Sequence, residues 1–190
     1  MSHNLLHNTN FHALLIKIDQ ELSSKVQEAG CPKCKGQLDQ AHYPRAPHGL
    51  PRHLRIYYEQ RLSFCCAKCR RRVTPQSVRF FGHRWFVAPI FMFISAITLG
   101  INERRLEQLK RHYDIRMSES TWKRWRRWWR EIFCLTPFWR QAKGLLTDAH
   151  AIEQRAPRSL FSAFEPSNES RIIILLRFLS PLTASFYHAI

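Results

Sequence analysis

Acidic residues are scarce in this chain. Only 14 Asp and Glu stand against 30 Lys and Arg, which gives a formal net charge of +16 and an isoelectric point near 10.3. Residues 43–130 hold 20 of the basic side chains and only five of the acidic ones, so the excess does not come from a disordered tail. This is not the near-neutral balance of a typical cytosolic enzyme, and a polyanion is the expected partner.

No segment clearly marks the chain for secretion or for a membrane. The N-terminus lacks a basic stub followed by an apolar run and a cleavage site, so we expect no secretory signal and a cytoplasmic location, where disulfides are rare. Residues 85–102 carry no charge for eighteen residues, which just reaches the lower limit for a spanning helix. Because Pro89, Gly100 and Asn102 interrupt this run, it favours a buried core helix over a membrane span.

Familiar catalytic motifs are also missing. The sequence has no His-x-His pair of the kind that binds metal in rolling-circle nucleases. Tyr57 and Tyr58, with His42, His48 and His53 nearby, are better explained as strand and loop residues than as a tyrosine nucleophile site. We therefore expect a protein without its own catalytic centre. The alternatives are a nuclease or recombinase with an unrecognised active site, and a zinc-stabilised protein-interaction module.

The sequence does contain two matched cysteine pairs. Cys31 and Cys34 form one CxxC motif, Cys66 and Cys69 form another, and thirty-one residues separate the two motifs. Each motif allows a tight turn to aim two sulfurs at one point, and two such turns complete a tetrahedral site. The spacing predicts a zinc ribbon in which these four cysteines bind one Zn²⁺.

Other uses of the cysteines fit less well. A redox CxxC needs only one pair in a βαβ setting, which this sequence lacks. Cys65 and Cys69 are spaced as CxxxC, so Cys65 could replace Cys66 as the third ligand, although the symmetry of the two motifs favours Cys66. Cys134 stands alone among aromatic residues and is expected to be a packed thiol.

Basic residues follow the second cysteine pair directly. Arg70, Arg71 and Arg72 leave the motif, and Arg79 and Arg84 come soon after. A rigid metal-bound turn would present these guanidinium groups at fixed positions, where contact with phosphate is their natural use.

Residues 101–133 have the pattern of a helix-turn-helix. A first helix is expected from about residue 102 and a second from the N-cap Ser118 to Phe133, with residues 86–99 as a supporting helix. On the second helix Trp122, Trp125, Trp129 and Phe133 share one stripe, while basic residues cover the rest. The nucleic-acid contacts expected from this helix come from Ser120, Lys123, Arg124, Arg126, Arg127 and Arg130.

The motifs CPKCKG and FCCAKCRRRVTPQSVRFFGHR, followed by a helix containing STWKRW, resemble the N-terminal zinc-ribbon and helix-turn-helix modules of bacterial insertion-sequence transposases. They also resemble short bacterial proteins that accompany mobile elements. The resemblance covers residues 30–133 and implies double-stranded DNA and a transposase as partners. In such transposases an RNase H-like domain with three carboxylates follows, but residues 134–190 have no strand pattern to build it. An accessory factor or regulator is therefore implied.

The expected fold is mainly α with a small β zinc ribbon. Residues 1–30 form an amphipathic packing helix, 31–82 the Cys₄ zinc ribbon, 83–133 the helix-turn-helix-like basic segment, and 134–190 a helical C-terminal segment. Within these parts, residues 53–66 read as a strand or hairpin arm, and residues 160–164 and 172–179 as helices. Residues 171–182 are apolar enough to pack internally or to form a homodimer.

Overall fold

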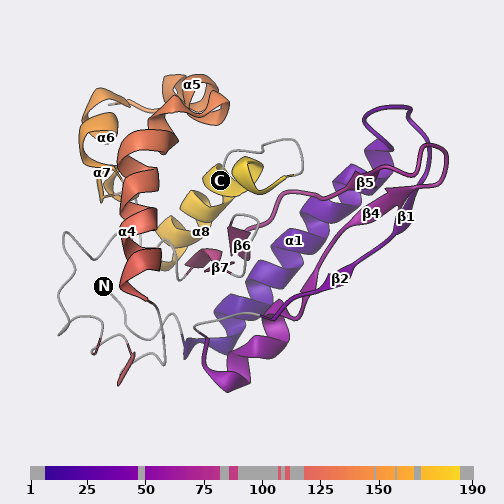
Figure 1. The fold of residues 1–190 in the computed structure, drawn as a ribbon, viewed down its shortest axis with the longest axis horizontal. Coiled ribbons are helices and arrows are strands. Elements are labelled where there is room, and N and C mark those ends of the chain that lie inside the picture. The colour runs from indigo at the N-terminus through magenta and orange to yellow at the C-terminus, as the bar shows by residue number, and fades with distance from the viewer. Residues whose placement is uncertain are drawn as a thin grey trace.

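The computed structural model describes residues 7–46, 50–81, 86–89, 107, 110–111, 118–147, 149–156, 158–164 and 168–184. These residues form a mainly helical protein with three small antiparallel sheets (Figure 1). The mainly α class is thereby confirmed.

The long N-terminal helix α1 (Thr9–Ala29) begins and ends where local chemistry requires it. The side chain of Asn8 accepts hydrogen bonds from the backbone N–H groups of residues 10 and 11 and so caps the helix. Gly30, at φ 72°, ends it. One side of α1 is buried through Phe11, Leu15 and Ile18, which pack into the main core.

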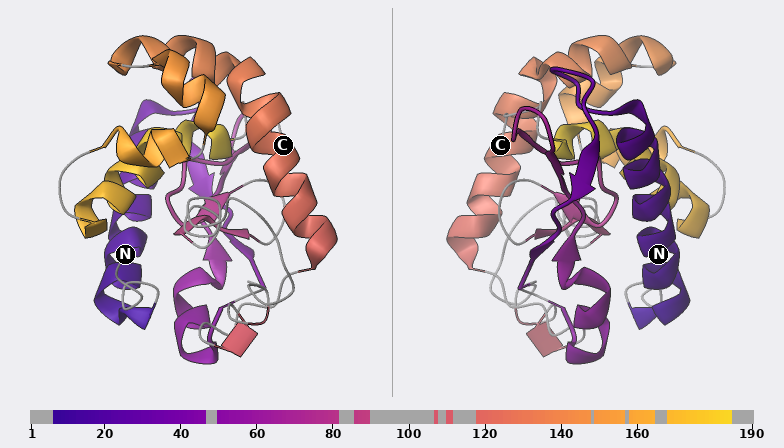
Figure 2. Two further views of the ribbon diagram at one scale, coloured as in Figure 1. Left: turned by 90° about the vertical axis from the view of Figure 1, so that its left-hand side faces the viewer. Right: turned by 90° about the vertical axis from the view of Figure 1, so that its right-hand side faces the viewer.

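A three-stranded antiparallel sheet lies along the C-terminal part of α1 (Figures 1 and 2). Its inward side chains join the partly buried Val26 of α1 in a small core that is separate from the main one. The side-chain amide of Gln27 donates to the carbonyl of Leu38 at 3.1 Å, which fastens the helix to the sheet. We call this sheet with its two cysteine turns the ribbon. Its strands, in spatial order, are β1 (Leu38–Gln40), β4 (Phe64–Cys66) and β5 (Arg72–Val73).

The prediction of a strand over residues 53–66 is wrong for its first half. Residues Arg52–Tyr58 form a 3₁₀ helix, η2, whose Leu54 and Tyr58 are buried against α1. Tyr58 and the buried His12 of α1 share a hydrogen bond of 2.7 Å. Leu54 and Tyr58 are four residues apart, a helical spacing that the β-forming aromatic residues mask. Directly after η2, strand β3 (Gln60–Arg61) pairs with β2 (Tyr43–Pro44), which precedes η2 in the chain.

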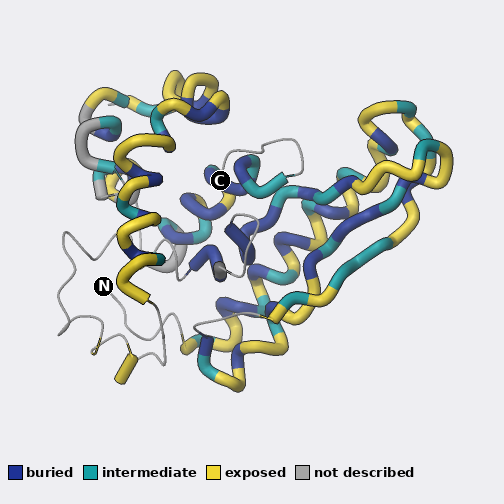
Figure 3. The backbone as a smooth tube through the Cα atoms, in the orientation of Figure 1, coloured by how far each residue is buried: buried dark blue, intermediate teal, exposed yellow. Residues whose placement is uncertain are grey.

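The second basic helix is present and begins at the predicted residue. Helix α4 (Glu119–Arg127) is capped by Ser118, whose hydroxyl accepts from the backbone N–H of Thr121 at 3.3 Å. A single π-helical turn, η3 (Trp128–Ile132), continues it and leads into the 3₁₀ turn η4 (Phe133–Leu135). Along α4 buried and exposed residues alternate, with the tryptophans on the buried side (Figure 3).

The wider π turn explains why one more tryptophan is buried than the sequence predicted. In a regular helix Trp129 would follow Trp125 on the apolar stripe, and Trp128 would lie beside it. In the structure Trp128 and Trp129 are both buried, with ring centroids 4.7 Å apart. Trp128 also contacts Phe81 of the small sheet of β6 (Phe80–Phe81) and β7 (Phe86–Val87), at 5.3 Å.

Short helices complete the chain. The segment predicted over residues 172–179 lies in helix α8 (Asn168–Leu179), which buries Leu175, Leu176 and Leu179 in the main core and so packs internally. The 3₁₀ turn η6 (Ser180–Thr183) follows it. The remaining elements are α5 (Pro137–Ala142), η5 (Lys143–Leu145), α6 (Ala149–Arg155) and α7 (Arg158–Ser162).

Several predictions fall wholly or partly outside the described residues. The predicted helix over 86–99 is wrong at its start, because Phe86–Val87 is strand β7, and its residues 90–99 are not described. Most of the predicted helix from residue 102 lies outside as well, so the helix-turn-helix stays a prediction. Within the part of the chain that the structure describes, no helix is both long and apolar enough to cross a membrane.

Candidate metal centre and basic surfaces

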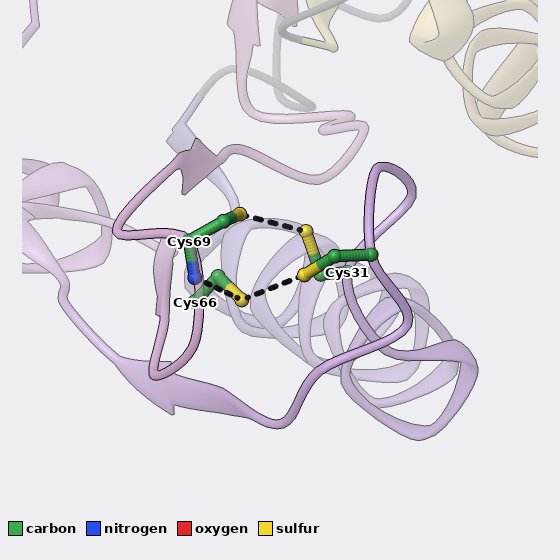
Figure 4. A group of neighbouring side chains, drawn as sticks. Cys31, Cys66 and Cys69 are labelled. Atoms are coloured by element: carbon green, nitrogen blue, oxygen red, sulfur yellow. Dashed lines mark hydrogen bonds between the residues drawn. The ribbon is translucent and has the colours of Figure 1, made fainter.

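The two CxxC motifs meet at the end of the ribbon, where all four sulfurs lie within 4.8 Å of one another. The sulfurs of Cys31 and Cys69 are 3.6 Å apart, and those of Cys34 and Cys66 are 3.5 Å apart. Figure 4 shows Cys31, Cys66 and Cys69 converging from the two turns. Sulfurs held about 2.3 Å from a tetrahedral metal are about 3.8 Å from each other. The four cysteines are thus arranged to hold one metal ion.

The two turns, which we call the knuckles, have the same backbone hydrogen bonds. In the first, the N–H of Lys35 donates to the carbonyl of Cys31 at 2.8 Å, and in the second the N–H of Arg70 donates to that of Cys66 at 3.0 Å. The N–H groups of Cys31 and Cys66 each donate to a carbonyl five residues later, both at 2.9 Å. Lys35 and Arg70 both adopt a positive φ, 56° and 58°, which is uncommon for residues other than glycine. The knuckles are therefore near-copies of one another.

Gly36 lets the two knuckles approach each other. A Cβ at this position would lie 3.0 Å from the Cβ of Lys68, 3.1 Å from the sulfur of Cys66 and 3.4 Å from that of Cys34. Carbon atoms prefer a separation of about 3.5–4.0 Å, so a side chain here would push the knuckles apart.

The thiols in this cluster differ in pKa. Burial raises the pKa of Cys31, but hydrogen bonds from the backbone of Cys34 and Lys33 and from neighbouring thiols outweigh it and bring that pKa to about 6. The backbone of Gly36 lowers the pKa of Cys34, yet burial and the neighbouring sulfurs raise it to about 11. Backbone hydrogen bonds, first that of Cys69, lower the pKa of Cys66. Sulfurs this close cannot all ionise by themselves, and a bound cation would favour the thiolate form of all four.

The structure selects Cys66, and not Cys65, for the cluster. Successive residues of a strand point to opposite faces, so Cys66 faces the ribbon core while Cys65 faces outward. The sulfur of Cys65 lies 3.6 Å from the carbonyl oxygen of Arg70, away from the other four. Cys134 is half-buried at the edge of the main core, where burial and then Glu153 raise its pKa, as expected of a packed thiol.

Exposed basic side chains surround the cysteine cluster. We call this set the knuckle tip, and the sequence of the two knuckles contains no acidic residue to balance it. Sequence reasoning identified only its two arginines, Arg70 and Arg71, and missed the lysines inside and beside the CxxC motifs. The signal was available in the repeated pattern CPKCK and CAKCR. The knuckle tip consists of Lys33, Lys35, Lys68, Arg70 and Arg71.

Arg72 is held in place beside the knuckle tip. Its guanidinium donates to the carbonyl of Ala41 at 2.8 Å and to the hydroxyl of Ser63 at 3.2 Å. It also lies 5.4 Å from the ring centroid of Tyr43, and Arg45 lies 4.8 Å from that centroid. Cation–π contacts of this kind orient guanidinium groups before any ligand arrives.

Arg79 was predicted as a phosphate contact, and the structure contradicts this. Its side chain is 5% exposed, and its Nε lies 2.7 Å from the fully buried carboxylate of Asp19 on α1. The other guanidinium nitrogens donate to the carbonyls of Tyr57 and Gln60 at 2.6 and 3.2 Å. Asp19 also accepts from the hydroxyl of Ser77 and the N–H of Val78, so Arg79 belongs to a structural network.

The remaining predicted contacts are on α4 and the π turn η3, apart from Arg84, which lies outside the described residues. Ser120, Lys123, Arg124, Arg127 and Arg130 are exposed, and Arg126 is half-buried. Lys123 pairs with Glu119 at 2.9 Å and Arg127 with Glu131 at 2.6 Å, so part of the positive charge is balanced within the helix. Neither pair is shielded from water, and each can open readily to a phosphate.

Comparison of the chain with protein-family models, with curated proteins and with solved structures finds no match.

Proposed function

We propose that this chain is a zinc-dependent nucleic-acid-binding protein whose partner is double-stranded DNA, and that it serves a transposable element as an accessory factor or regulator. The observation that carries the proposal is the knuckle pair: four converging sulfurs whose turns display basic side chains and no acidic ones. The association with a transposable element rests on the sequence resemblance alone.

Zinc is the metal that this donor set favours. Four thiolates in tetrahedral arrangement are typical of structural zinc sites, which have no open position for substrate. The ribbon has a small core of its own in which Cys31 and Cys66 are themselves members, so a metal at this point would supply much of its folding free energy.

Phosphate contact accounts for the charge around the metal centre. Arginine donates hydrogen bonds to phosphate from a planar, fork-shaped guanidinium group, and lysine supplies a compact point charge. These groups sit on turns whose backbone is fixed by the hydrogen bonds described above, which lowers the entropy lost on binding.

The metal part of the proposal is tested by elemental analysis of the purified protein. We expect one zinc per chain, and we expect Cys66→Ser to lose it, because three thiolates remain. Cys65→Ser is the matched control: the sulfur of Cys65 lies outside the cluster, so full zinc content is expected. Loss of zinc in the Cys65 variant with retention in the Cys66 variant would contradict the assignment.

The binding part is tested by titrating the zinc-loaded protein with a short DNA duplex at several salt concentrations. About five phosphate contacts predict a slope of log K against log salt of roughly −4 to −5. Binding that is unchanged between about 50 and 200 mM salt would contradict the proposal. So would binding to anionic vesicles without binding to DNA, which would indicate a membrane surface as the partner.

A further inference from the structure

Two groups of exposed basic side chains lie on different parts of the described molecule. We propose that one chain binds two separate duplex segments, one on each group, and thereby holds them together. This inference rests on the proposed function and adds that phosphate contact occurs on two surfaces. The first surface is the knuckle tip. The second, which we call the helix face, is the exposed side of α4 and of the π turn, with Lys123, Arg124, Arg127 and Arg130.

The knuckle tip is built as a fixed surface. Lys35 and Arg70 occupy equivalent positions of the two knuckles, and both have the positive φ that lysine and arginine seldom adopt. Gly36 brings the knuckles together closely enough to contact Lys68. Strained backbone of this kind persists where the surrounding structure holds it, and it often marks a functional surface. The basic side chains of both knuckles are therefore attached to one rigid backbone.

The helix face is fixed from behind by aromatic packing. Trp122, Trp125, Trp128 and Trp129 are each less than 8% exposed. Because they occupy the inner side of α4 and the π turn, the basic side chains must point away from the core. The face cannot rotate toward the ribbon without exposing this aromatic cluster to water.

The two surfaces are separated by the body of the protein. Figure 1 places α4 at one side of the molecule and the ribbon at the other. Between them lie α1, the β6 and β7 strands and α8, whose buried side chains make up the main core. No rearrangement that preserves this core can merge the two surfaces into one.

The stiffness of a duplex disfavours one segment reaching both surfaces. The persistence length of a duplex is about 150 bp, so bending a segment of about 20–30 bp costs free energy. A short duplex that contacts both surfaces would have to span or bend around the main core that lies between them. Two independent segments bind without this penalty.

Bridging is measured with two duplexes of about 20 bp that differ only in label. One is attached to beads, the full-length zinc-loaded protein is added below saturation, and capture of the second, fluorescent duplex is recorded. We expect capture that depends on the protein. At saturation, we expect two duplexes per chain by analytical ultracentrifugation, which also reports the number of chains in each complex.

Three variants test the two surfaces, and each variant replaces three basic side chains with Gln. The tip variant is Lys33→Gln, Lys68→Gln and Arg71→Gln. The face variant is Lys123→Gln, Arg124→Gln and Arg130→Gln. The matched control removes three exposed charges that lie on neither surface: Lys17→Gln, Lys25→Gln and Arg52→Gln. Zinc content and circular dichroism establish that each variant is folded.

The tip and face variants should each bind one duplex and lose capture of the second, whereas the control should retain capture. For each lost phosphate contact, the slope of log K against log salt should flatten by about 0.9. Capture that survives in either surface variant would overturn the inference.

Capture that returns when the tip and face variants are mixed would overturn it as well, because two copies of the chain would then be bridging. If the protein binds one duplex and never captures a second, this inference is wrong and the proposed function is unaffected. If the protein binds no duplex, both are wrong.

Discussion

Gly36 lies where the two knuckles approach each other, beside the four clustered cysteines. We expect Gly36→Ala to lower zinc affinity by about ten- to a hundredfold, as substitutions beside metal ligands commonly do. The reason is steric, since a Cβ would lie 3.1 Å from the sulfur of Cys66. Competition with a chromophoric chelator measures the change.

Gly144→Ala is the control for this prediction. A Cβ at Gly144 would meet nothing within 4 Å, so the substitution should leave zinc affinity unchanged. Equal zinc affinity in the Gly36 variant and the wild-type chain would show that the knuckles can separate without harm to the site.

The four cysteines that cluster could be predicted from the sequence, whereas the burial of Arg79 could not. The CxxC motif encodes its own local turn, so spacing alone paired the four sulfurs and preferred Cys66 over Cys65. Arg79 follows a run of exposed arginines and looks like one of them. Its partner Asp19 lies sixty residues earlier, on a helix whose sequence gives no sign of that contact.

At the scale of elements, α1 is joined to the strand segment around Arg79 by a buried ion pair. We expect Asp19→Asn to lower the free energy of unfolding by about 3–5 kcal/mol, because it leaves the guanidinium of Arg79 buried without a counter-charge. Chemical denaturation followed by tryptophan fluorescence measures the loss.

The matched control is Glu21→Gln, two residues further along the same helix. Glu21 pairs with Arg177 at 3.5 Å across an exposed surface, where ion pairs contribute little. The free energy of unfolding of the Glu21→Gln variant should stay near that of the wild-type chain. If the Asp19 and Glu21 variants were equally stable, the buried pair would not be what fastens α1.

Element boundaries were harder to predict where tertiary packing overrides local preference. Residues 52–58 contain β-forming aromatics, yet the fit of Leu54 and Tyr58 against α1 selects a 3₁₀ helix. Likewise, a regular helical repeat cannot anticipate the π turn, in which Trp128 and Trp129 are both buried and Trp128 contacts Phe81.

At the scale of the whole molecule, the described residues form two hydrophobic cores of unequal size, which should respond differently to metal removal. The ribbon core contains two of the cysteines, whereas the main core extends from α1 to η6 and contains none of the four. We therefore expect chelation to unfold the ribbon, residues 31–40 and 64–73, while the main core stays folded. Hydrogen exchange measured by mass spectrometry should show protection lost in the ribbon strands and kept in α8.

The control for this experiment is the chelated protein after zinc is restored, which should regain protection in the ribbon. Simultaneous loss of protection in α8 would mean that the two cores unfold as one cooperative unit. Unchanged protection in the ribbon would mean that its small core is stable without metal.

The number of residues between the two knuckles determines how long after the first knuckle the second one is synthesised. Thirty-one residues separate Cys34 from Cys66. At a synthesis rate of about 5–20 residues per second, the first knuckle is completed roughly 2–6 s before the second pair exists. During that interval the nascent chain offers only a two-sulfur chelate, from which a metal ion exchanges freely. The ion is retained only after the second knuckle arrives, so the ribosome, and not the metal, determines when the ribbon closes.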